Sequence, residues 1–220
     1  NQYVTEAKQY SMTFGISIDM PAGPSELLIL ADKSANPKYV AADLLSQAEH
    51  GIDSQVILVS NSKNLIDQVN KELNIQKNSL SRLKIINKSL ENSKSIFFEL
   101  IDDAIDFINE YAPEHYIINV ENEEYCISNL SSAGSVFIGN YTPESAGDYA
   151  SGTNHTLPTN GYAKQYSGVN TDSFFKTITF QKITKRGLNS ISIAIQTMAL
   201  SEALDAHKQA VSIRTKDNEN

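Results

Sequence analysis

At 220 residues, the chain is long enough to bury a substantial core and to form one large domain or two. A net charge of −8 with only 18 lysines and arginines disfavours a nucleic-acid partner, and the single cysteine, Cys126, excludes a disulfide framework and a multi-thiolate zinc site. No apolar run approaches the length of a membrane span and no signal peptide opens the chain, so we expect a cytoplasmic protein without membrane contact.

The first two thirds of the chain alternate short apolar runs with amphipathic stretches. The predicted strands are residues 26–32, 55–60, 83–87, 95–99, 115–120 and 135–139. The predicted helices are residues 37–49, 63–73, 102–111 and 122–130. This alternation is typical of βαβ units, so we predict an α/β fold with a parallel, incomplete Rossmann-like sheet.

The pattern changes near Gly168, where we predict the start of a small, mostly helical C-terminal domain. Residues 174–184 indicate a helical turn and a strand, residues 188–208 one apolar helix, and residues 215–220 a polar tail that frays. By helical spacing, Glu202 shares the apolar face of this helix and is a candidate for a buried site. His207 lies five residues further on and off that face, so either the helix breaks or the two side chains reach a site from different sides.

A polar segment rich in glycine and proline, Tyr141–Thr159, separates these two parts. Its sequence, YTPESAGDYASGTNHTLPT, predicts a long loop without a regular helix or strand, and loops of this length in compact domains are usually functional. Asp148 and His155 are its candidate site residues. The alternative is a loop whose Asp and Asn side chains only close turns on its own backbone.

Ligands of open parallel sheets bind at the carboxyl ends of the strands, so polar groups just past strands or on nearby helix ends are expected to form the site. Gln47 and His50 lie three residues apart at the end of a predicted helix and can point at one ligand, although His50 can equally serve only to stabilise the helix C-terminus. Glu114 and His115 enter a predicted strand and can supply a general base and a proton carrier. The alternative for that pair is an exposed acid beside a half-buried histidine.

Gln47, His50, Asp148 and His207 together offer nitrogen and oxygen donors without sulfur, which suits a catalytic zinc ion. They are scattered along the chain and form no compact metal motif, so their spacing does not establish a site. GxGxxG, Walker A and GxSxG motifs are also absent from the sequence.

Seven segments of the chain, taken in order, resemble histidinol dehydrogenases. They are DMPAGPSE, DLLSQAEHG, DSQVIL, APEH, SAGSVFIG, YTPESAGDYASGTNHTLPT and ALDAHK. They follow the family's order over nearly the whole chain, so the resemblance is specific. Members of that family use zinc and NAD to oxidise L-histidinol through the aldehyde to L-histidine, the last step of histidine biosynthesis.

The resemblance implies a role for each matching residue. The positions of the zinc ligands are matched by Gln47, His50, Asp148 and His207. The catalytic pair is matched by Glu114, which would activate water, and His115, which would relay protons. Substrate contacts are implied for Ser25 and Glu202 as well as for His115 and the zinc ligands, and His155 would support the site without binding the metal.

The resemblance covers only the C-terminal half of the family's chain, so we expect a fragment or an incomplete sequence. Asn1 matches the last NAD-contacting position of the family. Residues 1–24 would then be the tail of the NAD-side domain, residues 25–168 the substrate and zinc domain, and residues 169–220 a small domain exchanged in a homodimer. The alternative to an active dehydrogenase is an inactive fragment that binds zinc and substrate and dimerises.

Overall fold

The computed structural model describes residues 2–21 and 23–216. The chain divides into two compact units, Asn1–Phe174 and Phe175–Asn220, here called unit 1 and unit 2. The division falls a few residues beyond Gly168, where the sequence pattern changes. The roles assigned to residues 1–24, 25–168 and 169–220 stay predictions. No helix among the described residues is long and apolar enough to cross a membrane.

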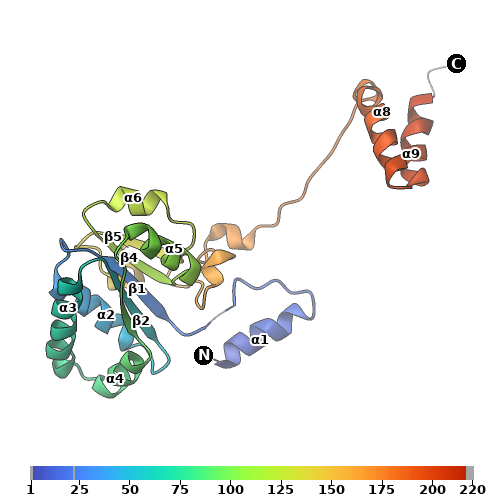
Figure 1. Cartoon of the computed structure of the whole chain (residues 1–220). Coiled ribbons are helices and arrows are strands. Elements are labelled where there is room, and N and C mark those ends of the chain that lie inside the picture. The colour runs from blue at the N-terminus through green and yellow to red at the C-terminus, as the bar shows by residue number, and fades with distance from the viewer. Residues whose placement is uncertain (1, 22, 217–220) are drawn as a thin grey trace. The chain divides into compact units, whose positions relative to one another are not determined.

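Unit 1 is built around a five-stranded parallel sheet with the strand order β3-β2-β1-β4-β5 (Figure 1). Its strands are β1 (Glu26–Ala31), β2 (Gln55–Ser60), β3 (Lys94–Phe97), β4 (His115–Asn119) and β5 (Ser135–Ile138). All strands are parallel, and the chain adds strands first on one side of β1 and then on the other. This order is that of the first five strands of a doubly wound Rossmann fold. The predicted fold class is therefore confirmed.

Helices connect the strands and cover both faces of the sheet (Figure 1). The helices of unit 1 are α1 (Gln2–Met12), α2 (Pro37–Ala48), α3 (Lys63–Gln76), α4 (Leu83–Glu91), α5 (Ile101–Tyr111), α6 (Glu123–Ser128) and α7 (Glu144–Tyr149), of which α2 to α6 lie between strands. Short 3₁₀ turns occupy Lys77–Ser79, Tyr162–Lys164 and Thr171–Phe174. Helix α2 begins as the sequence predicts, because the Asn36 side chain caps it and Pro37 takes its first position.

The core has two halves because side chains along a strand alternate between the two faces of the sheet. In β1, Leu27 and Ile29 pack with α2, α3 and α4, whereas Leu28 and Leu30 pack with α5 and α6. All four side chains are completely buried. Burial on both faces makes β1 a continuous apolar run, which is why the sequence shows it so clearly.

The strand predicted at residues 83–87 is wrong, since this segment begins helix α4. Leu83, Ile86 and Leu90 follow a helical spacing, and Ile86 packs against the sheet while the opposite face is exposed. Ser89, on the same side of α4, donates a hydrogen bond to the Ser54 carbonyl at 2.9 Å. A short apolar run does not separate strand from helix by itself, and the distant contacts decide here.

Two further predictions are corrected by the structure. The expected loop at Tyr141–Thr159 contains the short helix α7, and residues 175–184 form no strand. That segment exposes large apolar side chains such as Phe175, Ile178 and Phe180, and no strand of the described residues pairs with it. Helix α1 was not predicted.

Unit 2 contains two helices, α8 (Lys185–Ser201) and α9 (Asp205–Lys216), which pack together. The sequence predicts one helix here and leaves open a break between Glu202 and His207. The structure shows the break, at Ala203, which has a left-handed backbone with φ of +56°. The amide of Leu204 then donates back to the Ala199 carbonyl at 2.8 Å and closes the helix end. Of the predicted tail, residues 215 and 216 lie in α9, and residues 217–220 lie outside the described residues.

Candidate active site

His115 is the first residue of β4, and its ring is held in place from the neighbouring strand. Nδ1 lies 3.2 Å from the Glu26 carbonyl oxygen. A carbonyl only accepts, so Nδ1 carries the proton, and Nε2 of the neutral ring is free to accept one. Nε2 is buried without a hydrogen-bond partner among the described residues and lies 3.9 Å from Asp148 Oδ1. Burial lowers the pKa of His115, so the ring is a neutral base.

Glu114 precedes β4, and its carboxylate is fixed on one side. Oε2 accepts hydrogen bonds from Ser25 Oγ at 2.6 Å and from the Glu26 amide at 2.9 Å. Its main chain is fixed too, because the Ser135 amide donates to the Glu114 carbonyl at 2.8 Å. Burial raises the pKa of Glu114 to about 7, which suits a general base near neutral pH. Oε1 takes part in none of the hydrogen bonds among the described residues, so it remains available to a ligand.

Gln47 lies in the last turn of helix α2, and His50 follows two residues after the helix ends. Gln47 is 0% exposed, yet neither its amide oxygen nor its amide nitrogen has a hydrogen-bond partner among the described residues. A buried amide without partners is costly, so the side chain is poised for a partner that the protein chain does not supply. His50 lies at the surface end of the helix, with its ring partly exposed.

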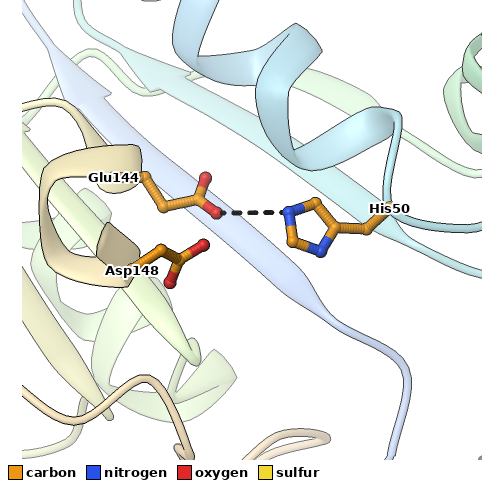
Figure 2. A group of neighbouring side chains, drawn as sticks. All are labelled: His50, Glu144 and Asp148. Atoms are coloured by element: carbon orange, nitrogen blue, oxygen red, sulfur yellow. Dashed lines mark ion pairs between the residues drawn. The ribbon is translucent and has the colours of Figure 1, made fainter.

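Helix α7 brings two carboxylates opposite His50 (Figure 2). Glu144 and Asp148 are four residues apart, so both project from the same side of this short helix. Glu144 Oε1 lies 4.0 Å from His50 Nε2, and one ligand atom from each of the three side chains falls within 4.8 Å of the other two. Burial, followed by the charges of Asp148, Glu114 and Asp43, raises the pKa of Glu144 to about 8.

A cavity of about 400 Å³ lies among these groups. Its lining consists of Ser25, His50, Glu114, His115, Asp148, Tyr149 and His155. Cavities of about 440 and 710 Å³ lie elsewhere in unit 1, but neither is lined by histidine or carboxylate side chains. The cavity with the histidines combines bases, a proton carrier and metal-binding atoms, and is therefore the candidate active site.

The cavity lies at the amino ends of the strands, and the expectation of a site at the carboxyl ends is wrong. Ser25 precedes β1, Glu114 precedes β4, and His50 stands between α2 and the start of β2. Helix α7 follows β5 and packs on α2, which returns Asp148 to this end of the sheet. The end of the loop is anchored here as well, because the Asn160 amide donates to Glu26 Oε1 at 2.8 Å.

Comparison with known proteins gives the family of the chain. A sequence model of histidinol dehydrogenase matches residues 1–215. The chain belongs to the histidinol dehydrogenase family. It is 58% identical over 214 residues to the histidinol dehydrogenase of Bacteroides thetaiotaomicron and 53% identical over 222 residues to the chloroplastic one of Arabidopsis thaliana. A crystal structure of histidinol dehydrogenase from Elizabethkingia anophelis superposes with a TM-score of 0.95 at 56% identity.

The chain spans about half the length of these histidinol dehydrogenases. The match with the Bacteroides protein covers 97% of this chain and 50% of the relative, and that with the Arabidopsis protein covers 100% and 48%. The crystal structure matches 100% of this chain with 51% of its own.

The structure brings six of the residues singled out in the sequence to the cavity, namely Ser25, His50, Glu114, His115, Asp148 and His155. Gln47 lies one helical turn before His50 and is buried. Glu202 and His207 belong to unit 2, where both are exposed, so Glu202 is not buried within its own unit. Asn1 lies outside the described residues. The functional roles of these residues stay predictions.

Sequence reasoning missed Glu144, which is 1% exposed and is the most buried carboxyl near the cavity. It stands in the PES segment of the predicted loop, where no helix is expected. The sequence signal that could have identified Glu144 is its spacing of four residues from Asp148. In a helix such as α7, this spacing places both carboxylates on one face.

Proposed function

We propose that this chain forms part of a zinc-dependent, NAD-linked histidinol dehydrogenase that oxidises L-histidinol through the aldehyde to L-histidine, the last step of histidine biosynthesis. The observation that carries the proposal is the state of His115. Its tautomer is fixed by the Glu26 carbonyl, and its free Nε2 faces a cavity lined with carboxylates. Oxidation of an alcohol requires a base that removes the hydroxyl proton, and Nε2 is placed to do so.

The residues present fit a zinc ion. His50 and Asp148 face the cavity, and the buried amide of Gln47 lacks any partner within the described chain. Together with His207 they give the nitrogen and oxygen set of a catalytic zinc site. Zinc, when bound there, would anchor the imidazole and amine of the substrate and act as a Lewis acid. Glu202 would hold the substrate amine.

Glu114 and His115 divide the proton transfers. His115 Nε2 accepts the proton of the substrate hydroxyl, while Nδ1 stays bonded to the Glu26 carbonyl. Glu114 uses its free Oε1 to take a proton from water in the second oxidation, because Ser25 and the Glu26 amide hold Oε2. The hydride acceptor in both oxidations would be NAD. Asn1 is the one proposed NAD contact of this chain.

The second candidate is an inactive module that binds zinc and substrate and dimerises. It is favoured by one observation: the histidinol dehydrogenases named above are about twice as long as this chain. In both cases the proposed partner is a second copy of the chain, whose Glu202 and His207 complete the site. A cytoplasmic location stays a prediction, since relatives include chloroplastic plant proteins.

Isothermal titration of L-histidinol into the chain, with and without zinc, tests the substrate site. We expect binding that requires zinc and is lost in His50→Ala, while Asp106→Asn, an exposed carboxyl on α5, binds as the wild type does. NADH formation in the same samples then separates an active dehydrogenase from a binding module. Binding that is unaffected by His50→Ala would contradict the proposed site.

A further inference from the structure

Three carboxyl groups and two imidazoles share the site, and no lysine or arginine among the described residues forms an ion pair with any of the three carboxylates. Beside burial, the charge of Asp148 helps to raise the pKa of both Glu114 and Glu144. The lysine ion pairs of the described residues all involve other carboxylates, namely Asp19, Glu91, Glu110 and Glu121. Buried carboxylates are normally paired or bound to a metal, so this cluster lacks a positive charge.

Glu144 has little protein support for a buried carboxyl. Its strongest hydrogen bond is a long one, from Ser46 Oγ at 3.5 Å, and His50 Nε2 is 4.0 Å away. Figure 2 shows its carboxylate directed toward the space between His50 and Asp148. A side chain that is 1% exposed and so weakly bonded calls for a further partner in that space.

The size of the space fits a metal ion. One ligand atom each from His50, Glu144 and Asp148 lies within 4.8 Å of the others, so a central ion would be about 2.8 Å or less from each. Zinc binds imidazole nitrogen and carboxylate oxygen at about 2.1 Å, so the atoms need to close in by roughly 0.7 Å or less. Rotation of a carboxylate on its side chain covers such a difference.

An independent observation points to the same space. His115 Nε2 is buried without a partner among residues 2–21 and 23–216, in a side chain that is 2% exposed, and it faces Asp148 at 3.9 Å. The orphaned amide of Gln47 lies one turn before His50 on α2. One polar atom without a partner, His115 Nε2, therefore faces the triad from β4, and the unpartnered Gln47 amide lies three residues before His50.

We propose that Glu144 is a metal ligand, and that His50, Glu144 and Asp148 hold a divalent cation with side chains of unit 1 alone. The proposal rests on the metal centre proposed above and adds a carboxylate that the family resemblance does not assign. All three ligands belong to one compact unit, so the cation binds before unit 2 contributes. The carboxylates of Glu144 and Asp148 together also balance the charge of a divalent ion. A ligand set in which Asp148 is the only carboxylate leaves part of that charge uncompensated.

The test is titration of Zn²⁺ and Co²⁺ into the untagged, metal-free chain, followed by calorimetry and by the visible spectrum of Co²⁺. Glu144→Leu keeps the buried volume but removes the donor atoms, and we expect its affinity to fall more than about 100-fold, beyond the loss typical of groups that only support a ligand. Glu144→Gln keeps an oxygen donor without the charge, and we expect an intermediate loss with a shifted Co²⁺ spectrum.

The matched control is Asp43→Asn, which removes a neighbouring charge that acts on Glu144 but no ligand atom of the triad. Its affinity is expected to change by no more than about fivefold. Denaturant unfolding without metal checks the fold, and we expect Glu144→Gln to be at least as stable as the wild type, because it loses an unpaired buried acid.

The outcomes separate this proposal from the metal centre itself. If His50→Ala and Asp148→Asn lose metal while both Glu144 variants bind with the wild-type affinity and spectrum, Glu144 is not a ligand and only the present inference fails. If all four variants bind as the wild type does, the metal centre proposed for the family's chemistry fails as well.

Discussion

At the scale of single residues, the site is built from titratable groups whose ionisation is opposed by burial. Glu114 and Glu144 have pKa values raised to about 7 and about 8, and burial raises that of Asp43 to about 7. Each pKa is higher in the folded than in the unfolded chain. The folded chain therefore holds protons at pH values where the unfolded chain has already released them.

From this difference we predict that the metal-free chain becomes less stable as the pH rises from about 5 to about 8. Each of the three carboxyls lowers the free energy of unfolding by at most about 1.4 kcal/mol per pH unit, in the pH range between its pKa in the unfolded chain and its pKa in the folded chain. Denaturant unfolding in the presence of a chelator, repeated over this pH range, measures the slope. Asp43→Asn is expected to flatten it, whereas Asp106→Asn on the exposed face of α5 serves as the control. A free energy of unfolding that rises with pH in this range would contradict the prediction.

At the scale of elements, helix α7 is positioned by a close approach to β5. A Cβ on Gly147 would lie 2.6 Å from Phe137 Cε1, and the Phe137 ring is itself buried in the core. The glycine thus lets α7 lie against the sheet, and that contact sets the positions of Glu144 and Asp148. Gly134 plays a similar part before β5, where a Cβ would lie 2.5 Å from the Glu114 carbonyl oxygen.

We predict that Gly147→Ala lowers the free energy of unfolding by about 1–3 kcal/mol, the usual cost of overpacking, and weakens metal binding by displacing α7. Ser145→Ala, on the exposed side of the same helix, is the matched control and should change neither quantity. Thermal unfolding and zinc titration measure both effects. Wild-type zinc affinity in Gly147→Ala would show that the position of α7 does not determine the metal site.

At the scale of the whole molecule, unit 2 exposes more apolar surface than a pair of helices in water normally leaves uncovered. Ile193 and Met198 of α8 are more than half exposed, as is Phe180 in the segment before it. Large exposed apolar patches mark interfaces, and the proposed interface is with a second copy of the chain. In that homodimer, His207 would complete the zinc site of the partner.

We predict that His207→Ala weakens zinc retention without loss of folded structure, and that mixing it with Asp148→Asn restores retention. In a mixed dimer, one site carries both substitutions and the other carries neither. Full exchange of subunits between equal amounts makes about half of the dimers mixed, so about a quarter of all sites regain the wild-type ligands. Zinc content after dialysis measures the recovery, and each variant alone is the control. No recovery in a mixture shown to exchange subunits would place His207 in the site of its own chain.

Local structure in this chain follows from local sequence. The buried strands and capped helices of unit 1 are visible in the sequence because apolar periodicity and end signals act over a few residues. The family motifs also single out Ser25, Glu114, His115 and Asp148, which the cavity brings together. The helical character of α4 was missed, since its sheet contacts involve residues far away in the sequence.

The sequence by itself therefore determined the parallel α/β fold, its helical C-terminal part and most of the residues at the candidate site. Only the tertiary structure decided that the cavity lies at the amino ends of the strands and that the buried Glu144 lies 4.0 Å from His50 of its lining. His50 and Glu144 come from different elements, and their approach depends on how α7 packs against β5 and α2. Such contacts leave no periodic trace in the sequence, because packing in three dimensions sets them rather than spacing along the chain.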